Sequence, residues 1–254
     1  MEIIILGSGT CMPMSDRASP SILLLLGGSR ILLDMGPGTV RQLAKAGVGH
    51  DTIDHIFISH FHPDHTADLI HFLFVTRNSG NMKTRKPFTI TGPDGLESFI
   101  EQLGRAYKGW LDISEEIMRI EELVLSKPET RQYPNYTMCS QPLSHTANSI
   151  AYRFCEDRVN TVVYSGDTGF CDGIVDLSKD CNLLILECSF PEGEEAEGHL
   201  TPSKAGRVAA LACAKRLLLV HFYPEVLETD ITGQCRKIYG GELILGRDML
   251  RIPV

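Results

Sequence analysis

The chain carries four side chains that can bind metal ions within six consecutive positions, namely His60, His62, Asp64 and His65. Imidazole and carboxylate groups are ligands that zinc, manganese and iron accept in proteins. A polar turn that is rich in histidine is the alternative interpretation. The whole chain has only nine histidines, however, and three of them fall within this loop, which favours a metal site.

The residues around this loop predict how it is positioned. Residues 53–59 are apolar and β-branched and predict a strand, and residues 67–77 predict the helix that follows. Alternation along an extended segment points the first three candidate ligands to one side, and His65 lies beside them where the chain turns into the helix. We therefore expect one short loop to serve two metal ions.

Three further candidates occur later in the chain. His145, Asp167 and His221 each follow a predicted strand. A single histidine at a strand end is more often structural than a ligand, so each signal is modest alone. Open sheets place their functional sites at the carboxyl ends of strands. Together the three residues supply the ligands that a site for two metals still lacks after the first loop.

The composition indicates an α/β protein with a substantial core. The chain has 254 residues, of which 43% are hydrophobic, and we expect a single domain over residues 1–254 rather than two fused halves. No apolar run approaches the roughly 18 residues of a membrane span, and the N-terminus lacks a basic leader, so we expect a cytoplasmic protein. The eight scattered cysteines are expected to be reduced. The net charge of −8 argues against nonspecific attraction of nucleic acid.

With these residues in this order, the chain resembles the metallo-β-lactamase superfamily over nearly its whole length. The resemblance implies an α/β fold of the αββα type, in which two mixed sheets pack face to face and metal ions bind at one edge. The implied ligands of one metal are His60, His62 and His145. The implied ligands of the other metal are Asp64, His65 and His221, and Asp167 would bridge the two ions.

Three other positions refine this resemblance. Asp34 matches a carboxylate that orients the ligand loop by hydrogen bonds, and a cap of the turn before Gly36 is the alternative. Members that hydrolyse β-lactams often have Arg where His65 stands, and oxygen-reducing di-iron members have Glu where His62 stands. Histidine at both positions favours a hydrolase with two divalent metal ions, which we expect to be zinc, with manganese or iron as alternatives.

The chain also resembles the ribonuclease Z branch of the superfamily in four segments, at residues 7–10, 87–93, 187–190 and 199–201. In that branch the positions of Glu187 and His199 form a proton-delivery pair. The resemblance therefore implies that His199 is the general acid for the leaving oxygen and that Glu187 orients it. Asp64 would accept or relay the proton of the attacking water. A solvent-exposed loop histidine is the alternative for His199.

Two departures from that branch guide the choice of substrate. Enzymes that mature tRNA typically insert a protruding arm between the positions of His145 and Asp167, where this chain has two short predicted strands, and Leu186 stands where the branch often has His. We therefore expect a phosphodiesterase in which a metal-bridging hydroxide attacks a small phosphodiester or a short nucleic acid. A tRNA 3′ endonuclease is the first alternative, and an ester, lactone or thioester hydrolase is the second. A metal-holding binding module without turnover is the third.

Two expectations concern other contacts of the protein. A basic cluster of Arg77, Lys83, Arg85 and Lys86 is either a solvated loop or a group that holds a substrate phosphate. The resemblance also makes a homodimer possible, and no membrane partner is expected.

Overall fold

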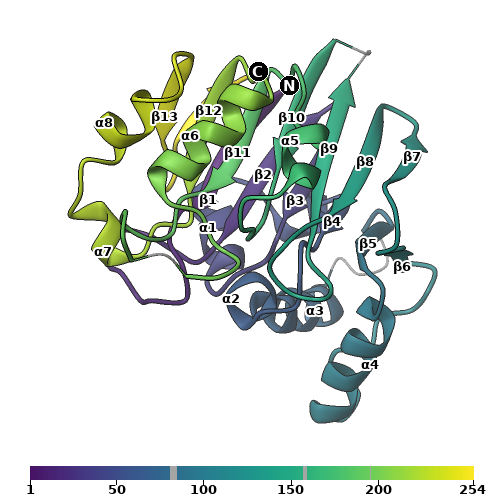
Figure 1. The fold of residues 1–254 in the computed structure, drawn as a ribbon. Helices are drawn as coiled ribbons and strands as arrows, with labels where there is room; N and C mark the ends of the chain where they lie inside the picture. The colour runs from purple at the N-terminus through teal and green to yellow at the C-terminus, as the bar shows by residue number, and fades with distance from the viewer. Residues whose placement is uncertain (81–84, 157–158, 195) are drawn as a thin grey trace.

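The computed structural model describes residues 1–80, 85–156, 159–194 and 196–254, which form two β-sheets with helices on their outer sides (Figure 1). The first sheet has seven strands in the order β14-β1-β2-β3-β4-β5-β6. In chain order these strands are β1 (Glu2–Gly7), β2 (Ser21–Leu26), β3 (Ser29–Leu33), β4 (His55–Phe57), β5 (Phe88–Pro93), β6 (Met118–Leu123) and β14 (Arg251–Pro253).

The second sheet also has seven strands, in the order β13-β12-β11-β10-β9-β8-β7. In chain order these strands are β7 (Glu129–Tyr133), β8 (Tyr136–Pro142), β9 (Ile150–Glu156), β10 (Asn160–Tyr164), β11 (Leu183–Glu187), β12 (Arg216–Val220) and β13 (Glu242–Leu245). Both sheets are mixed, with antiparallel pairs on one side and parallel pairs from β3 to β6 and from β10 to β13. Parallel neighbours end at the same edge, so the residues that follow them are brought together.

The packing of β1 explains why its sequence is apolar without interruption. Ile3 and Ile5 lie in the core between the sheets, together with residues of the second sheet such as Tyr152 and Ile185. Ile4 and Leu6 lie in a second core, between the first sheet and its helices. A strand that is covered on both faces has no solvent face on which polar residues would alternate. This arrangement of two sheets between two helix layers confirms the predicted αββα sandwich.

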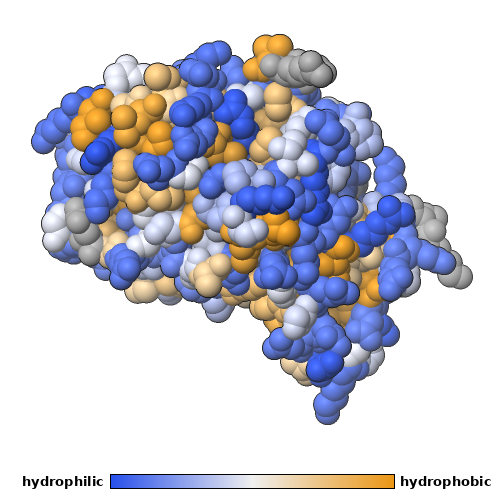
Figure 2. Space-filling model, turned by 45° about the vertical axis from the view of Figure 1, so that its right-hand side comes forward, coloured by the Kyte–Doolittle hydropathy of each residue, from blue (hydrophilic) through white to orange (hydrophobic). Residues whose placement is uncertain are grey.

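The helices form the two outer layers. On the first sheet they are α1 (Thr39–Lys45), η1 (His50–Thr52), α2 (Pro63–Thr66), α3 (Asp68–Asn78) and α4 (Leu96–Ala106). On the second sheet they are α5 (Asp172–Leu177), α6 (Pro202–Leu211), α7 (Pro224–Leu227) and α8 (Ile231–Arg236). The helix predicted over residues 67–77 is confirmed as α3, and the short helix α2 precedes it. Figure 2 shows one face of the molecule, on which hydrophilic residues predominate and smaller groups of hydrophobic residues lie between them. Within the described ranges, no helix combines the length and apolar character needed to cross a membrane.

Candidate metal centre

The loop after β4 places four candidate ligands together because its backbone changes from extended to helical at His62. The backbone of His62 is still extended, with φ −62° and ψ 145°, and Pro63 occupies the first turn of α2. The helix then turns Asp64 and His65 back towards His60, so that the ring centroids of His60 and His65 lie 4.2 Å apart.

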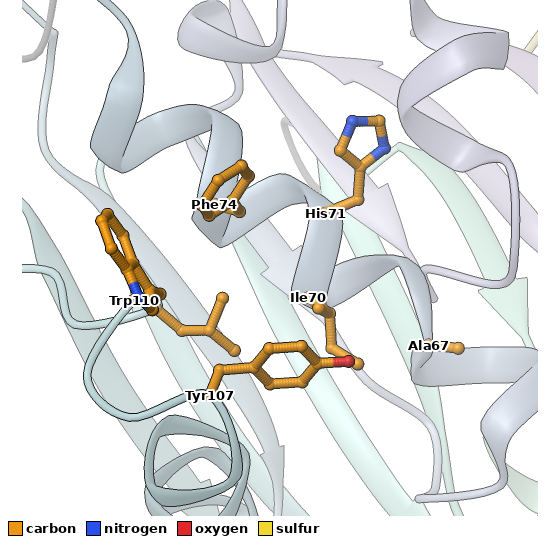
Figure 3. A pocket seen from close by; sticks show the side chains of 7 residues that line it. Ala67, Ile70, His71, Phe74, Tyr107 and Trp110 are labelled. Atoms are coloured by element: carbon orange, nitrogen blue, oxygen red, sulfur yellow. The ribbon is translucent and has the colours of Figure 1, made fainter.

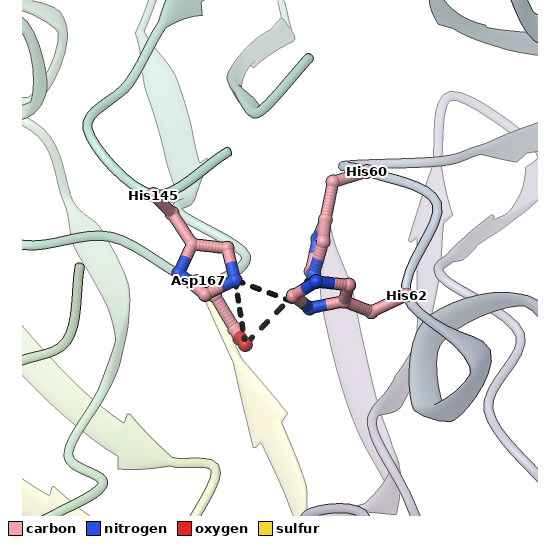
Figure 4. Close-up of side chains that lie close together, drawn as sticks. All are labelled: His60, His62, His145 and Asp167. Atoms are coloured by element: carbon pink, nitrogen blue, oxygen red, sulfur yellow. Dashed lines mark hydrogen bonds and ion pairs between the residues drawn. The ribbon is translucent and has the colours of Figure 1, made fainter. Parts of the chain in front are cut away.

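The second sheet contributes three more residues from the carboxyl ends of its strands. His145 follows β8, Asp167 follows β10 and His221 directly follows β12. Figure 4 shows that His145 and Asp167 face His60 and His62 from the opposite side. The structure thus brings together all seven residues that the sequence singled out as ligands, and within each of two groups the ligand atoms lie within 4.8 Å of one another: His60, His62, His145 and Asp167 form one, and Asp64, His65 and His221 the other.

Asp167 lies between these two groups. Its Oδ2 atom is 3.9 Å from Nε2 of His60 and 3.8 Å from Nε2 of His145. Its Oδ1 atom is 3.2 Å from Nε2 of His65 and 3.3 Å from Nε2 of His221. One carboxylate oxygen therefore faces each group, which is the arrangement that a bridging ligand requires.

The hydrogen bonding at this centre fits divalent cations. Nε2 of His60, His65 and His221 and Oδ1 of Asp167 are buried and form no hydrogen bond with any described residue. Buried polar atoms normally have a partner, because an unsatisfied one costs about 1–3 kcal/mol. The other ring nitrogens of these histidines do have partners: Oγ of Ser59 for His60, Oδ2 of Asp34 for His65 and Oγ of Ser189 for His221. The free atoms thus point at one space that a metal ion would fill.

Asp34 holds the histidine loop from beneath. Its Oδ2 atom accepts hydrogen bonds from Nδ1 of His65 at 2.7 Å, from Oγ of Ser59 at 2.7 Å and from the hydroxyl of Tyr164 at 2.6 Å. Its Oδ1 atom accepts the backbone N–H of Ser59 at 2.7 Å. The helix cap that was the alternative role belongs to Gly38, which precedes α1. Asp34 therefore fixes the ring of His65 with Nε2 directed at the metal centre.

The charges at the centre are divided unevenly among its side chains. Burial lowers the pKa of His60 well below its usual range, and burial also lowers the pKa of His145, so both rings are neutral and have a lone pair to offer. Burial alone would lower the pKa of His65, but Asp167 and Asp34 more than offset it and raise that pKa well above its usual range. A cation that binds Nε2 of His65 therefore displaces a proton from it.

Glu187 and His199 form a pair beside this centre. Nδ1 of His199 lies 3.0 Å from Oε1 and 3.1 Å from Oε2 of Glu187, whose side chain is 1% exposed. The side chain of His199 is itself only 13% exposed, so it is not a solvent-exposed loop histidine. Burial would lower the pKa of His199, but the hydrogen bond to Glu187 outweighs it and raises that pKa.

Sequence reasoning missed the residue that joins this pair to the metal centre. The hydroxyl of Ser189 contacts Glu187 and lies 2.9 Å from Nδ1 of His221. The backbone N–H groups of Thr168 and Leu200 also donate to Glu187, at 2.7 Å and 3.2 Å. The one available signal was the position of Ser189 two residues after Glu187, which does not reveal a contact with a strand end more than thirty residues away.

Arg85, one residue of the basic cluster, is not available to hold a substrate phosphate. Arg85 is 7% exposed, its guanidinium donates to the carbonyl oxygens of His50 and Ile53, and it lies 4.4 Å from the ring centroid of Phe88. Nη1 and Nη2 of Arg85 therefore bond within the fold, and the side chain is buried there. Lys83, another member of the cluster, lies outside the described residues.

An apolar cavity of about 620 Å³ lies between α3 and the segment that follows α4. Figure 3 shows Ile70, His71 and Phe74 on α3, and Tyr107 and Trp110 on the segment that faces it. Its lining carries one titratable imidazole, His71, and none of the seven candidate ligands. This cavity is thus separate from the reaction centre.

The two-sheet sandwich and the convergence of imidazole and carboxylate groups at its edge define a metal-dependent hydrolase with the metallo-β-lactamase fold. The chain belongs to the β-lactamase superfamily: the family model described as "Beta-lactamase superfamily domain" matches residues 29–222. The divalent metals that this class uses fit the centre described above.

Similar proteins agree with this assignment. The chain is 29% identical to the ribonuclease Z of Streptomyces coelicolor, in an alignment that covers 100% of this chain and 97% of the relative. It is 26% identical to human tRNase Z, short form, with a TM-score of 0.82 and with 100% and 99% of the two chains covered. The metallo-β-lactamase fold protein YhfI of Bacillus subtilis is 22% identical to this chain and has a TM-score of 0.84. The superposition covers 99% of each of the two chains.

Proposed function

We propose that this hydrolase is a phosphodiesterase that uses two divalent metal ions and acts on a small phosphodiester or a short nucleic acid. One observation carries the proposal: two adjacent groups of candidate ligands meet at Asp167, and a buried Glu187–His199 pair stands beside them. A metal site needs the first feature, and cleavage of a bond with a poor leaving group benefits from the second.

The contacts support the following ligand sets. His60, His62 and His145 would hold one ion and Asp64, His65 and His221 the other, with Asp167 between them. Mixed imidazole and carboxylate sets of this kind favour zinc, and manganese or iron would use the same atoms. When bound, two divalent ions make water a nucleophile at neutral pH and offset the negative charge on the phosphoryl oxygens.

The chain's own groups would move the protons. His199, protonated because Glu187 raises its pKa, donates from Nε2 to the oxygen that leaves phosphorus. Glu187 keeps the proton on Nδ1 and holds the ring in one orientation. Burial would raise the pKa of Asp64, but the nearby rings of His221 and His65 outweigh burial and lower that pKa. Asp64 therefore stays ionised and accepts the proton of the attacking water.

The segment between His145 and Asp167 supports the proposal of a small substrate. Its described residues form β9 and β10, which belong to the second sheet. The alignment with the Streptomyces ribonuclease Z extends over 304 positions, whereas this chain has 254 residues, so the relative carries segments without a counterpart here. A net charge of −8 also disfavours a large polyanion. A tRNA 3′ endonuclease of the ribonuclease Z type is the second candidate, because similar proteins are named ribonuclease Z and tRNase Z.

We also propose that a homodimer covers the exposed aromatic rings beside the apolar cavity. Phe74 is 45% exposed and Trp110 is 56% exposed, and their ring centroids lie 6.3 Å apart. Exposed apolar clusters of this kind mark interaction surfaces. Light scattering of the purified protein and of a Trp110→Glu variant tests this: a wild-type monomer contradicts it.

A metal-content measurement combined with a substrate screen tests the main proposal. Wild-type protein should bind two equivalents of zinc or manganese and hydrolyse bis-p-nitrophenyl phosphate in preference to thioester and lactone substrates. His199→Ala should keep both metals and lose roughly 10²–10⁴-fold in kcat on phosphodiesters with poor leaving groups. Cleavage of a tRNA precursor at a higher kcat/KM than a dinucleotide would favour the second candidate. Loss of a metal ion in His199→Ala would show that His199 is a ligand instead, since it also lies close to Asp167 and His221.

A further inference from the structure

Two aromatic side chains lie parallel to each other beside the Glu187–His199 pair. The rings of Phe190 and Tyr223 are stacked, with centroids 4.7 Å apart and an angle of 23° between their planes. The ring of Phe190 meets that of His199 at 5.4 Å, and the ring of Tyr223 meets that of His221 at 6.0 Å. We call Phe190 and Tyr223 the aromatic wall, because they form the side of the metal centre next to the proton donor.

The backbone that carries the aromatic wall is the same backbone that builds the centre. Phe190 directly follows Ser189, whose hydroxyl contacts Nδ1 of His221, and the N–H of Phe190 donates to the carbonyl of Leu200. Tyr223 lies two residues after His221, and its hydroxyl is 3.4 Å from Sγ of Cys11. Both rings are half-buried. A ring surface that is already fixed in place can bind a ligand without the entropic cost of ordering it.

Four exposed carboxylates follow the two residues of the aromatic wall in the sequence. The loop that leads from Phe190 to His199 carries exposed Glu192, Glu194 and Glu197, and Glu225 is exposed two residues after Tyr223. A phosphate held against this side would be repelled by these carboxylates. An aromatic group without charge would not be repelled, and it would gain the stacking energy that ring surfaces offer to bases.

We propose that the aromatic wall binds a nucleobase on the leaving-group side of the scissile bond, in a substrate whose leaving part is a nucleoside without a further phosphate. This inference rests on the proposed function, because it takes His199 as the donor to the leaving oxygen. In the step, the oxygen of water forms a bond to phosphorus and its proton passes to Asp64. The bond from phosphorus to the nucleoside oxygen breaks, and that oxygen takes the proton from Nε2 of His199. The base of the departing nucleoside then lies against the aromatic wall, on the side of Phe190.

Kinetics on matched dinucleoside monophosphates test the inference. The product that keeps the phosphate identifies the leaving side, and substrates without a base on either side, or with an added terminal phosphate on the leaving side, are then compared. Removing the leaving-side base should lower kcat/KM of the wild type by about 5- to 150-fold, the range of one stacked base. Removing the other base should change it less. The added phosphate should lower kcat/KM as well.

Variants assign this selectivity to the aromatic wall. Phe190→Ala should bring the ratio between substrates with and without the leaving-side base close to one, whereas Tyr223→Phe, which keeps the ring and removes the contact with Cys11, should preserve it. Phe99→Ala is the matched control, because Phe99 lies in α4 and belongs to another stacked pair, with Phe61 at 4.9 Å. It should leave the ratio unchanged.

A binding measurement separates this inference from the proposed function. Saturation-transfer NMR with adenosine and with ribose needs no turnover, and contacts should appear at the base protons for the wild type and weaken in Phe190→Ala. Base contacts without cleavage of any phosphodiester would sink the proposed function and keep the wall as a base site. Cleavage with no base contact, or with equal kcat/KM for substrates with and without the leaving-side base, would overturn the inference and leave the phosphodiesterase standing.

Discussion

Asp34→Asn alters the histidine loop without touching any candidate ligand. The carboxylate accepts four hydrogen bonds, at 2.6 to 2.7 Å, and is fully buried. Asparagine has the same shape but carries one acceptor oxygen and one NH₂ donor. In either orientation of the amide, its NH₂ group faces an N–H group that donated to the carboxylate in the wild type. That donor is the backbone of Ser59 in one orientation and the ring of His65 in the other.

Each orientation has a distinct cost. If the NH₂ group faces the backbone of Ser59, a buried N–H loses its acceptor and the free energy of unfolding falls by about 1–3 kcal/mol. If it faces His65, the ring moves its proton to Nε2, the atom that would bind the metal. Loss of such an outer partner typically weakens metal affinity by about 10- to 100-fold, or ~1.4–2.7 kcal/mol.

Competition with a chromophoric chelator, on protein first stripped with EDTA, measures the two metal affinities, and urea denaturation of the stripped protein measures the free energy of unfolding. Asp68→Asn is the control: this buried carboxylate accepts the N–H of Val40 at 2.6 Å and touches none of the candidate ligands. We expect Asp34→Asn to weaken one site, that of His65, more than the other, and Asp68→Asn to weaken neither. An Asp34→Asn protein that loses stability but binds both metals as the wild type does would refute the reasoning.

Three other outcomes follow from the structure. Metal removal should lower stability, because a cation present at 100 times its Kd contributes about 2.7 kcal/mol; a melting temperature that EDTA leaves unchanged would contradict the proposed centre. Burial lowers the pKa of His55 to about 3 in the folded protein, whereas the pKa is about 6.5 in the unfolded chain. Between these two pH values the unfolded chain binds one more proton, so His55 alone lowers the free energy of unfolding by about 1.4 kcal/mol for each pH unit of acidification. Urea curves of metal-free His55→Asn should therefore show a shallower acid loss than the wild type, and parallel pH profiles would exclude this origin. Gly166→Ala should lower the free energy of unfolding by roughly 1–3 kcal/mol, because φ is +58° and the added Cβ atom would lie 2.5 Å from Cβ of Ser59. Calorimetry of the stripped protein measures this loss, and a melting temperature equal to that of the wild type would contradict the prediction.

The division of the centre between two sheets has a consequence for folding. The loop after β4 supplies four candidate ligands and the second sheet supplies three. Each of the two ligand groups draws on both sheets, so neither group is complete until the sheets pack together. The contact between Tyr164 of β10 and Asp34 after β3 joins the same two sheets. Metal affinity is therefore linked to the packing of the whole sandwich, and variants in the inter-sheet core should weaken it.

Several features could be predicted from the sequence because they are local. Three histidines and an aspartate within six positions indicate a metal-binding loop whatever the surrounding fold. The alternation of apolar runs with turns indicates strands and helices. The end of a strand is a local property too, which is why His145, Asp167 and His221 could be singled out. The order of these residues along the chain then matched a known superfamily, and the family model and the fold confirm that match.

Only the tertiary structure decided which distant groups meet. The contact of Ser189 with His221, the support of His65 by Asp34 and the stack of Phe190 on Tyr223 each join segments that follow different strands. The same holds for Arg85, whose charge suggested a phosphate site. Its guanidinium instead donates hydrogen bonds to backbone carbonyl groups. Residue types and spacing state what a side chain can do, but its partners depend on how two sheets twist and pack, and that is set by the whole core at once.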